Sequence, residues 1–269
     1  MPAREFFAAI RINWREPTGG IVVSGSRQGP NILAINRRYY SLPPAEHRFF
    51  APYFAHPKFY KAGLHNTVRG LRDQKRNVRI FFSGTLSKSA YSDKFKFPIL
   101  NRDKIMRHLV EKFEWAIEGD SGAVGVKPIL VVSTSDTRDI VEKHKFRLKT
   151  YIDVMSRSDF FICPPGWLMP HSHNIIEAMS VGTIPITNYN SYMHPPLSPD
   201  ANCLAFATLR EFEGAIDRAL RMDAQEVRRL RQGVISYYEE HLEPASFGKK
   251  LVTRQPLILE IVVNDESGR

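Results

Sequence analysis

Residues 158–186, with the sequence SDFFICPPGWLMPHSHNIIEAMSVGTIPI, constrain the fold of this chain more than any other segment. A short apolar run at 160–163 ends in a Pro-Pro-Gly turn, and its length and flanks favour a buried strand over a helix. A loop rich in Pro, Gly and His follows at 164–173, then apolar residues at helical spacing, and then a second expected strand at 183–186. This order is typical of an open α/β sheet, whose ligands bind beyond the carboxyl ends of the strands. The sequence therefore predicts the chemistry in the loop at 164–173.

The same alternation of strands and helices extends over residues 77–245. Further strands are expected at 78–82, 128–132 and 203–206, and amphipathic helices at 102–113, 149–155, 211–220 and 224–240. This alternation predicts an α/β fold with a parallel, doubly wound, Rossmann-like sheet. Residues 1–76 are expected to form a separate, irregular N-terminal region. Residues 246–269 are expected to form a C-terminal tail, in which 257–263 are apolar enough for a last strand.

Composition limits the class of protein. Of the 269 residues, 43% are hydrophobic and 25% are charged, as in a globular protein with a sizeable core. The net charge of +10 indicates either a generally basic surface or an anionic partner, such as a phosphorylated ligand, an anionic membrane surface or a nucleic acid. No aromatic-basic RNA-binding motif or helix-turn-helix pattern is present, so nucleic-acid binding is only an alternative. Several arginines alternate with acidic residues and predict a solvated, salt-bridged face: Arg218, Arg221, Arg228, Arg229 and Arg231.

The cysteines and the apolar runs point to a compartment. Cys163 and Cys203 cannot build a disulfide framework or a four-cysteine zinc site, and two free cysteines fit a reducing compartment. No apolar run reaches the roughly 20 residues of a membrane-spanning helix, and the first residues contain no secretory apolar core. We therefore expect a soluble, cytoplasmic protein, with peripheral attachment to an anionic membrane as an alternative.

Glu177 is the first candidate for binding. It belongs to a short expected helix whose apolar face is formed by Ile175, Ile176 and Met179, so the carboxylate is predicted to face the loop. A carboxylate beyond the end of a strand can accept both hydroxyls of a ribose. The same spacing also fits a capping box, with Asn174 as N-cap and Glu177 three residues later. The spacing does not decide between the two.

The loop before this helix offers a site for a phosphate. Gly166, Ser172 and the amides of the helix N-terminus suit an anion, because the helix dipole favours negative charge there. His171 and His173 could donate a proton or a hydrogen bond to a leaving phosphate. No Asp-x-Asp triplet is present, and neither histidine has further ligands at a suitable spacing, so we expect no bound metal.

A second candidate loop follows the strand at 78–82. Gly84 lets the backbone approach a ligand closely, and Arg102, at the start of a helix, could hold a phosphate in a bidentate manner. Tyr189 and Tyr192 lie in the loop that follows residues 158–186. They could stack on a base or sugar or cover the edge of the sheet.

These motifs together resemble the C-terminal half of exostosin-type glycosyltransferases, over about residues 78–206. The family pattern has an aromatic strand, Cys-Pro-x-Gly, a Ser two residues before an Arg, Glu-Ala, and Gly-Cys-Ile-Pro-Val. The matching residues here are Cys163-Pro164-Pro165-Gly166, Ser172, Glu177-Ala178 and Gly182-Thr183-Ile184-Pro185-Ile186. The upstream segment RIFFSGTLSKSAYSDKF, with Arg102, is similar to the first strand and loop of that family's nucleotide-binding domain.

The resemblance implies a GT-B enzyme that transfers a sugar, usually from a UDP-sugar, to a glycan or glycolipid acceptor and requires neither a metal nor a cofactor. Glu177 would hold the ribose, Gly166 and Ser172 with the helix start would hold the diphosphate, and Gly84 would line the cleft. Residues 1–76 would then be a reduced or truncated acceptor-side domain. Its catalytic base is expected at His56, with His47 as an alternative.

Two positions depart from the family pattern. Asn174 stands where the family has an arginine, so its phosphate contact is lost or supplied by His173, Arg102 or a lysine of the loop 85–101. Thr183 replaces a cysteine of similar size. A catalytically inactive nucleotide-sugar-binding module remains an alternative to an active transferase of polysaccharide biosynthesis.

Overall fold

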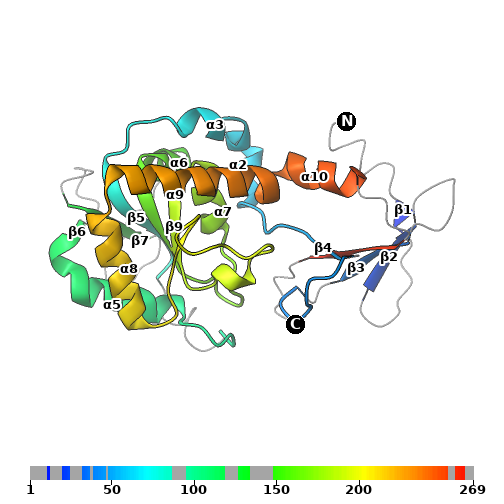
Figure 1. Ribbon diagram of the computed structural model, residues 1–269, viewed down its shortest axis with the longest axis horizontal. Coiled ribbons are helices and arrows are strands. Elements are labelled where there is room, and N and C mark those ends of the chain that lie inside the picture. The colour runs from blue at the N-terminus through cyan, green and yellow to red at the C-terminus, as the bar shows by residue number, and fades with distance from the viewer. Residues whose placement is uncertain are drawn as a thin grey trace. The chain divides into compact units, whose positions relative to one another are not determined.

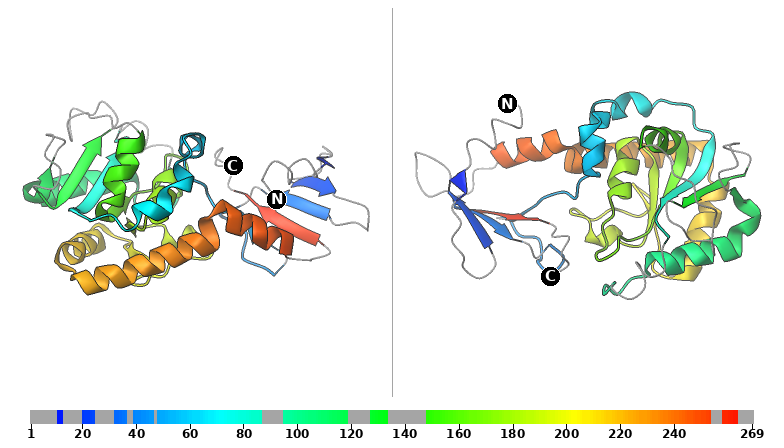
Figure 2. Two further views of the ribbon diagram at one scale, coloured as in Figure 1. Left: turned by 90° about the horizontal axis from the view of Figure 1, so that it is seen from above. Right: turned by 180° about the vertical axis from the view of Figure 1, so that it is seen from behind.

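The computed structural model describes residues 11–12, 20–24, 32–36, 39–46, 48–86, 95–118, 127–133, 148–253 and 258–263. The chain divides into two compact units (Figures 1 and 2). The larger unit is Phe54–His241, and the smaller unit combines Met1–Tyr53 with Leu242–Arg269. Both boundaries differ from those expected at 76 and 245.

The larger unit is built on a sheet of six parallel strands in the order β10-β9-β8-β5-β7-β6. Its strands are β5 (Val78–Gly84), β6 (Ile117–Glu118), β7 (Ile129–Ser133), β8 (Ser158–Cys163), β9 (Ile184–Thr187) and β10 (Leu204–Ala205). The prediction of an α/β fold with a parallel sheet is confirmed.

Helices connect these strands. They are α2 (Pro57–Lys61), α3 (Val68–Leu71), α5 (Arg102–Phe113), α6 (Leu148–Ser156), α7 (His173–Ser180), α8 (Leu209–Arg221) and α9 (Ala224–Tyr237), with a π-helix at Tyr238–Leu242. The chain passes from β5 through α5 towards β7 on one side, and from β7 through α6 back to β8 on the other. Because parallel crossovers are right-handed, α5 and α6 lie on opposite faces of the sheet. No helix in the described ranges is long and apolar enough to cross a membrane.

The two central strands form the core of the larger unit. Both strands are apolar on their two faces, as expected for strands of a parallel sheet covered on both sides. Phe81 of β5 and Phe161 of β8 are fully buried, and their rings meet edge-to-face at 5.4 Å. These strands hold their carboxyl ends, and the loops that follow, in fixed positions.

The smaller unit contains a mixed sheet in the order β1-β2-β3-β11-β4. Its elements are β1 (Arg11–Ile12), β2 (Gly20–Ser24), β3 (Ile32–Asn36), β4 (Arg48–Phe50), α10 (Pro244–Thr253) and β11 (Ile258–Val262). β11 runs parallel to both β3 and β4, and Arg48 Nε lies 2.6 Å from Glu260 Oε2. The segment expected to be a tail thus provides a central strand. Its apolar sequence fits that place, since Ile261 is buried against Ala51 and Phe49.

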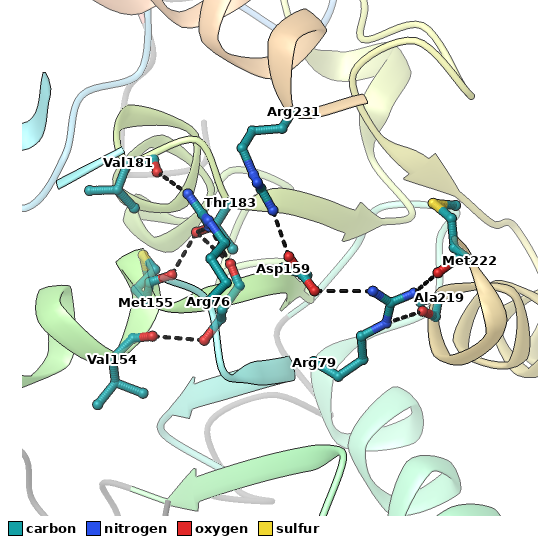
Figure 3. Close-up of polar contacts among 11 residues, drawn as sticks. Arg76, Arg79, Val154, Met155, Asp159, Val181, Thr183, Ala219, Met222 and Arg231 are labelled. Atoms are coloured by element: carbon teal, nitrogen blue, oxygen red, sulfur yellow. Dashed lines mark hydrogen bonds and ion pairs between the residues drawn. The ribbon is translucent and has the colours of Figure 1, made fainter. Parts of the chain in front are cut away.

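An arginine network explains why residues 54–76 belong to the larger unit. It lies at the amino ends of the strands, opposite the ends where a ligand is expected (Figure 3). Arg72 Nε donates to Ser180 O at 3.0 Å, and Arg76 Nη2 donates to Val181 O at 2.7 Å. Two cations therefore satisfy carbonyls at the C-terminal end of α7, where positive charge is favourable.

Asp159 is the acidic centre of this network. It accepts from Arg79 Nη1 at 3.0 Å and from Arg231 Nη2 at 2.5 Å, as Figure 3 shows. Burial, followed by repulsion from Arg231, lowers the pKa of Arg76 to about 9, while Asp159 opposes the shift. The prediction that Arg231 belongs to a solvated face is therefore wrong. Arg218, in contrast, pairs with the partly exposed Asp200 and Glu226.

Candidate functional site

The site predicted from the sequence lies at the carboxyl ends of β5 and β8. These neighbouring strands are followed by α5 and α7, and the order of the sheet reverses between them, since the chain leaves β5 in one direction and β8 in the other. In open α/β sheets such a reversal point is where ligands bind. Gly84 ends β5, and the loop 164–172 follows β8, so the two predicted loops meet there.

Arg102 joins these two loops. It is the first residue of α5 and only 5% exposed. Its Nε donates to Pro165 O at 3.0 Å, and its Nη2 donates to Ser172 Oγ at 3.3 Å. A methyl group on Gly84 would lie 3.4 Å from Arg102 Nη1. The guanidinium thus contacts both loops, through the Pro165 carbonyl and the Ser172 hydroxyl of one and the Thr85 carbonyl of the other.

Asn174 completes this polar cluster. Its Nδ2 donates to Ser83 O at 3.0 Å, and its Oδ1 lies 3.4 Å from Ser172 Oγ. The amide therefore bridges the start of α7 to the end of β5. In this cluster Arg102 provides a positive charge, which the Asn174 side chain does not have.

Gly166 keeps the loop after β8 compact. Its amide donates to Pro170 O at 3.2 Å, and a methyl group there would lie 2.4 Å from His171 O. Only glycine fits so close to another backbone segment. The loop leads to Ser172, which is the N-cap residue of α7 but does not cap it with its side chain. The Ser172 hydroxyl contacts Arg102 and Asn174 instead.

Glu177 lies one turn further along α7 and is 3% exposed. Its Oε1 accepts from the backbone amide of His56 at 3.1 Å. The capping-box alternative is therefore wrong, because Ser172, not Asn174, is the N-cap and Glu177 binds a segment distant in sequence. Burial raises the pKa of Glu177, and the His56 amide, the Tyr151 hydroxyl and charge on His173 oppose this shift.

Tyr151 is a site residue that the sequence analysis missed. Its buried hydroxyl lies towards Glu177 without a hydrogen bond of normal geometry, and burial together with the charge of Glu177 raises its pKa. The signal in the sequence was one tyrosine on the apolar face of the helix expected at 149–155. A buried hydroxyl usually needs a partner.

His56 and His173 lie against each other. Their rings meet edge-to-face, with centroids 5.3 Å apart. His173 Nδ1 lies 2.7 Å from Phe54 O, and His56 Nδ1 accepts from the amide of Lys58 at 3.1 Å, which caps α2. Both histidines thus lie beside Glu177. His47 lies outside the described residues.

Other predicted residues have different roles. Burial lowers the pKa of His171 to about 3, and nearby His194 adds to the shift. His171 is therefore neutral at pH 7 and carries no positive charge that could attract a phosphate. Tyr189 is fully buried against His171 and cannot stack on a ligand. Tyr192 packs on Phe97 with ring centroids 5.7 Å apart. No group of three potential metal ligands is found among His, Cys, Asp and Glu of the described residues.

Comparisons with known proteins give a partial match. No protein-family model matches the chain. A segment of 90 residues, 33% of the chain, is 31% identical to a probable glycosyltransferase of Arabidopsis thaliana and covers 17% of that protein.

Two solved structures illustrate the structural similarity. A UDP-forming trehalose-phosphate synthase of Burkholderia xenovorans matches 72% of this chain with 11% identity and a TM-score of 0.42. Anabaena HepE, solved in complex with UDP and glucose, matches 77% of this chain with 12% identity and a TM-score of 0.43. The matches cover 50% and 52% of those chains, so this chain spans about half their length.

Proposed function

We propose that this chain binds the donor in a GT-B glycosyltransferase of the exostosin type. The reaction would transfer a sugar from a nucleotide diphosphate-sugar, a UDP-sugar, to a glycan or glycolipid acceptor. The observation that carries the proposal is that two buried charged residues lie at the reversal point of the sheet: Arg102 of α5 contacts Ser172 at the start of α7, and Glu177 lies one turn further along α7. The 90-residue similarity to a probable plant glycosyltransferase supports the same class.

The diphosphate would bind at the end that contains Arg102. Its guanidinium, the Ser172 hydroxyl and the N-terminus of α7 converge there, and Gly84 adds no side chain beside the guanidinium. Guanidinium forks and helix N-termini are suited to phosphate oxygens. Arg102 would thereby take over the charge that the resemblance expects at position 174.

The ribose would bind at Glu177. One carboxylate oxygen already accepts from His56, and a carboxylate has acceptor capacity for several donors on its two oxygens. The second oxygen would receive the ribose hydroxyls. Three residues along a helix correspond to a rise of about 4.5 Å, which separates Asn174 near the diphosphate from Glu177.

Arg102 and the dipole of α7 would stabilise the diphosphate as it leaves. Negative charge develops on that group as the sugar bond breaks, and fixed donors aimed at it lower the barrier. The proposed reaction therefore needs no metal or cofactor. Activity and nucleotide binding should be the same in EDTA and in magnesium.

A thermal-shift screen tests the proposal. The full chain is heated with UDP, GDP, ADP and CMP, each in EDTA and in magnesium. We expect the largest stabilisation with UDP, independent of the metal, because ligands that bind only the folded chain raise its melting temperature. The absence of a shift with every nucleotide would contradict the proposal.

A further inference from the structure

The segment 57–76 carries a large share of the positive charge of the chain. It contains six lysines and arginines and one acidic residue, Asp73, so it contributes a net charge of +5 to the +10 of the whole chain. The segment forms α2, a short 3₁₀-helix at Leu64–Asn66 and α3, and α3 lies on the outside of the larger unit (Figure 1). Charge of one sign concentrated in this way favours contact with an anionic partner.

The two sides of this segment differ. On the inner side Phe59 and Val68 are buried in the core, and Arg72 Nε donates to Ser180 O at 3.0 Å. These contacts hold the segment on the larger unit. The side chains that the segment exposes instead are mostly basic, and include Lys58, Lys61, Arg69 and Lys75.

The three exposed lysines are not neutralised within the part of the chain that the structure describes. None of them forms an ion pair with a described carboxylate, and neither does Asp73 pair with a described cation. Arg69 shares Glu239 with Arg72, and its Nε lies 3.8 Å from Glu239 Oε1. On α8, in contrast, Arg218 contacts two carboxylates. The positive charge of the segment is therefore open to an external partner.

This basic surface begins beside the candidate site. α2 starts directly after His56, whose amide donates to Glu177 Oε1 at 3.1 Å. Lys58 belongs to the first turn of α2. An anionic partner that contacts the lysines would thus lie next to the proposed nucleotide site.

The side chains of the segment favour a lipid surface over a nucleic acid. Proteins that bind single-stranded nucleic acids combine basic grooves with aromatic side chains on which the bases stack. The large apolar side chains exposed among the described residues are Phe54, Trp115 and Trp167, and none of them belongs to the segment 57–76. Lysines without such neighbours are suited to the head groups of anionic lipids, where charge alone provides the attraction.

We propose that Lys58, Lys61, Arg69 and Lys75 form a docking surface for anionic lipid head groups. Attachment of this kind involves no inserted side chain, so it is reversible and is screened by salt, with a Debye length of about 10 Å at 0.1 M. Its consequence for the reaction rests on the proposed function. A glycolipid acceptor in the same membrane would be held beside the donor.

Two triple variants with the same change in net charge provide a matched test. K58Q/K61Q/K75Q removes the lysines of the basic surface. The control K104Q/K112Q/R210Q removes three exposed cations of α5 and α8, which also form no ion pair with a described residue. Each full-length chain is sedimented with vesicles of phosphatidylcholine, with and without about one third phosphatidylglycerol, at low and high salt. Binding to a random oligonucleotide and the affinity for UDP are measured in parallel.

We expect the wild type to bind only the anionic vesicles, and only at low salt. A lysine near an anionic membrane is worth about 1 kcal/mol, or roughly fivefold in affinity, so K58Q/K61Q/K75Q should bind these vesicles about 100-fold more weakly. The control should lose less than about fivefold, and the UDP affinity of K58Q/K61Q/K75Q should stay within about twofold.

The inference is overturned if the wild type does not bind anionic vesicles at low salt, or if the control loses as much as K58Q/K61Q/K75Q. It is also overturned if the lysines are required for oligonucleotide binding and not for vesicle binding. A wild type that binds anionic vesicles through these lysines but binds no UDP would contradict the proposed function and leave the docking surface in place.

Discussion

The exchange of Glu177 for glutamine should affect nucleotide affinity and stability in opposite directions. Glutamine keeps the shape of the side chain, and its oxygen can still accept from the His56 amide at the observed 3.1 Å. The second carboxylate oxygen is replaced by an amide that donates. A ribose hydroxyl would then lose a charged acceptor, and hydrogen bonds to charged groups are worth about 1.5–3 kcal/mol. We therefore expect UDP affinity to fall roughly 10- to 150-fold, and at least tenfold in Glu177→Ala.

Stability should change the other way. Burial raises the pKa of Glu177, so the folded chain holds this proton more tightly than the unfolded chain does. The wild type is therefore relatively most stable below the pKa of the unfolded chain, and it loses this stability as the pH rises through the pKa of the folded chain. Glutamine does not titrate and does not have this loss. At neutral pH the E177Q variant should be as stable as the wild type or more stable, and the difference should shrink on acidification.

Urea unfolding between about pH 4 and 8, combined with calorimetric UDP titration, measures both effects. A variant that is less stable at neutral pH but binds UDP normally would refute the reasoning. Glu177 would then serve only to anchor the segment around His56.

Three further substitutions are expected to have different effects. Two of them change the proposed diphosphate end of the site, and the third changes the arginine network outside the site. Arg102→Lys removes the guanidinium fork, so UDP affinity should fall about tenfold while the affinity for uridine stays the same, both measured by calorimetry. Gly84→Ala places a methyl group 3.1 Å from Phe82 Cζ and 3.4 Å from Arg102 Nη1, and should cost about 1–3 kcal/mol in urea unfolding and weaken UDP binding more than uridine binding. Thr183→Val removes a hydroxyl that accepts from Arg76 at 2.9 Å, which should cost about 1–3 kcal/mol but leave UDP affinity within about twofold. Equal losses of UDP and uridine in the first two variants, or a normal stability of the third, would contradict these assignments.

The strand-loop-helix segment at residues 158–186 could be predicted because its signals are local. The apolar run that became β8, the turn after it and the periodicity of α7 all lie within residues 158–186, and burial on both faces left little choice of structure. The place of β11 depends on pairing with β3 and β4, more than 200 residues earlier in the chain. Local sequence patterns do not encode such long-range pairing.

The candidate site was predicted in part for the same reason. Arg102, Ser172, Gly84 and Asn174 were named from motifs, and the structure brings them together. The partner of Glu177 is a backbone amide, which no side-chain pattern reveals. The contacts of His173 with Phe54 O and of His56 with the amide of Lys58 are likewise made to the backbone, so residue type does not reveal them.

Tyr189 and Arg231 both lie in environments that differ from the predicted ones, and this difference has a physical cause. Both residues have long side chains with an apolar body and a polar tip, which can be either buried or exposed. Tyr189 fills the core beside His171, and Arg231 reaches the half-buried Asp159. Their environment is set by the three-dimensional neighbours and not by the neighbouring residues in the sequence.

Calorimetric titration of the full chain with UDP in EDTA tests the central claim most directly. The account predicts saturable binding without a metal, weaker binding of uridine because it cannot reach Arg102, and weaker binding of inorganic diphosphate because it cannot reach Glu177. Uridine and diphosphate that both bind as tightly as UDP, or a chain that binds none of the three, would contradict it.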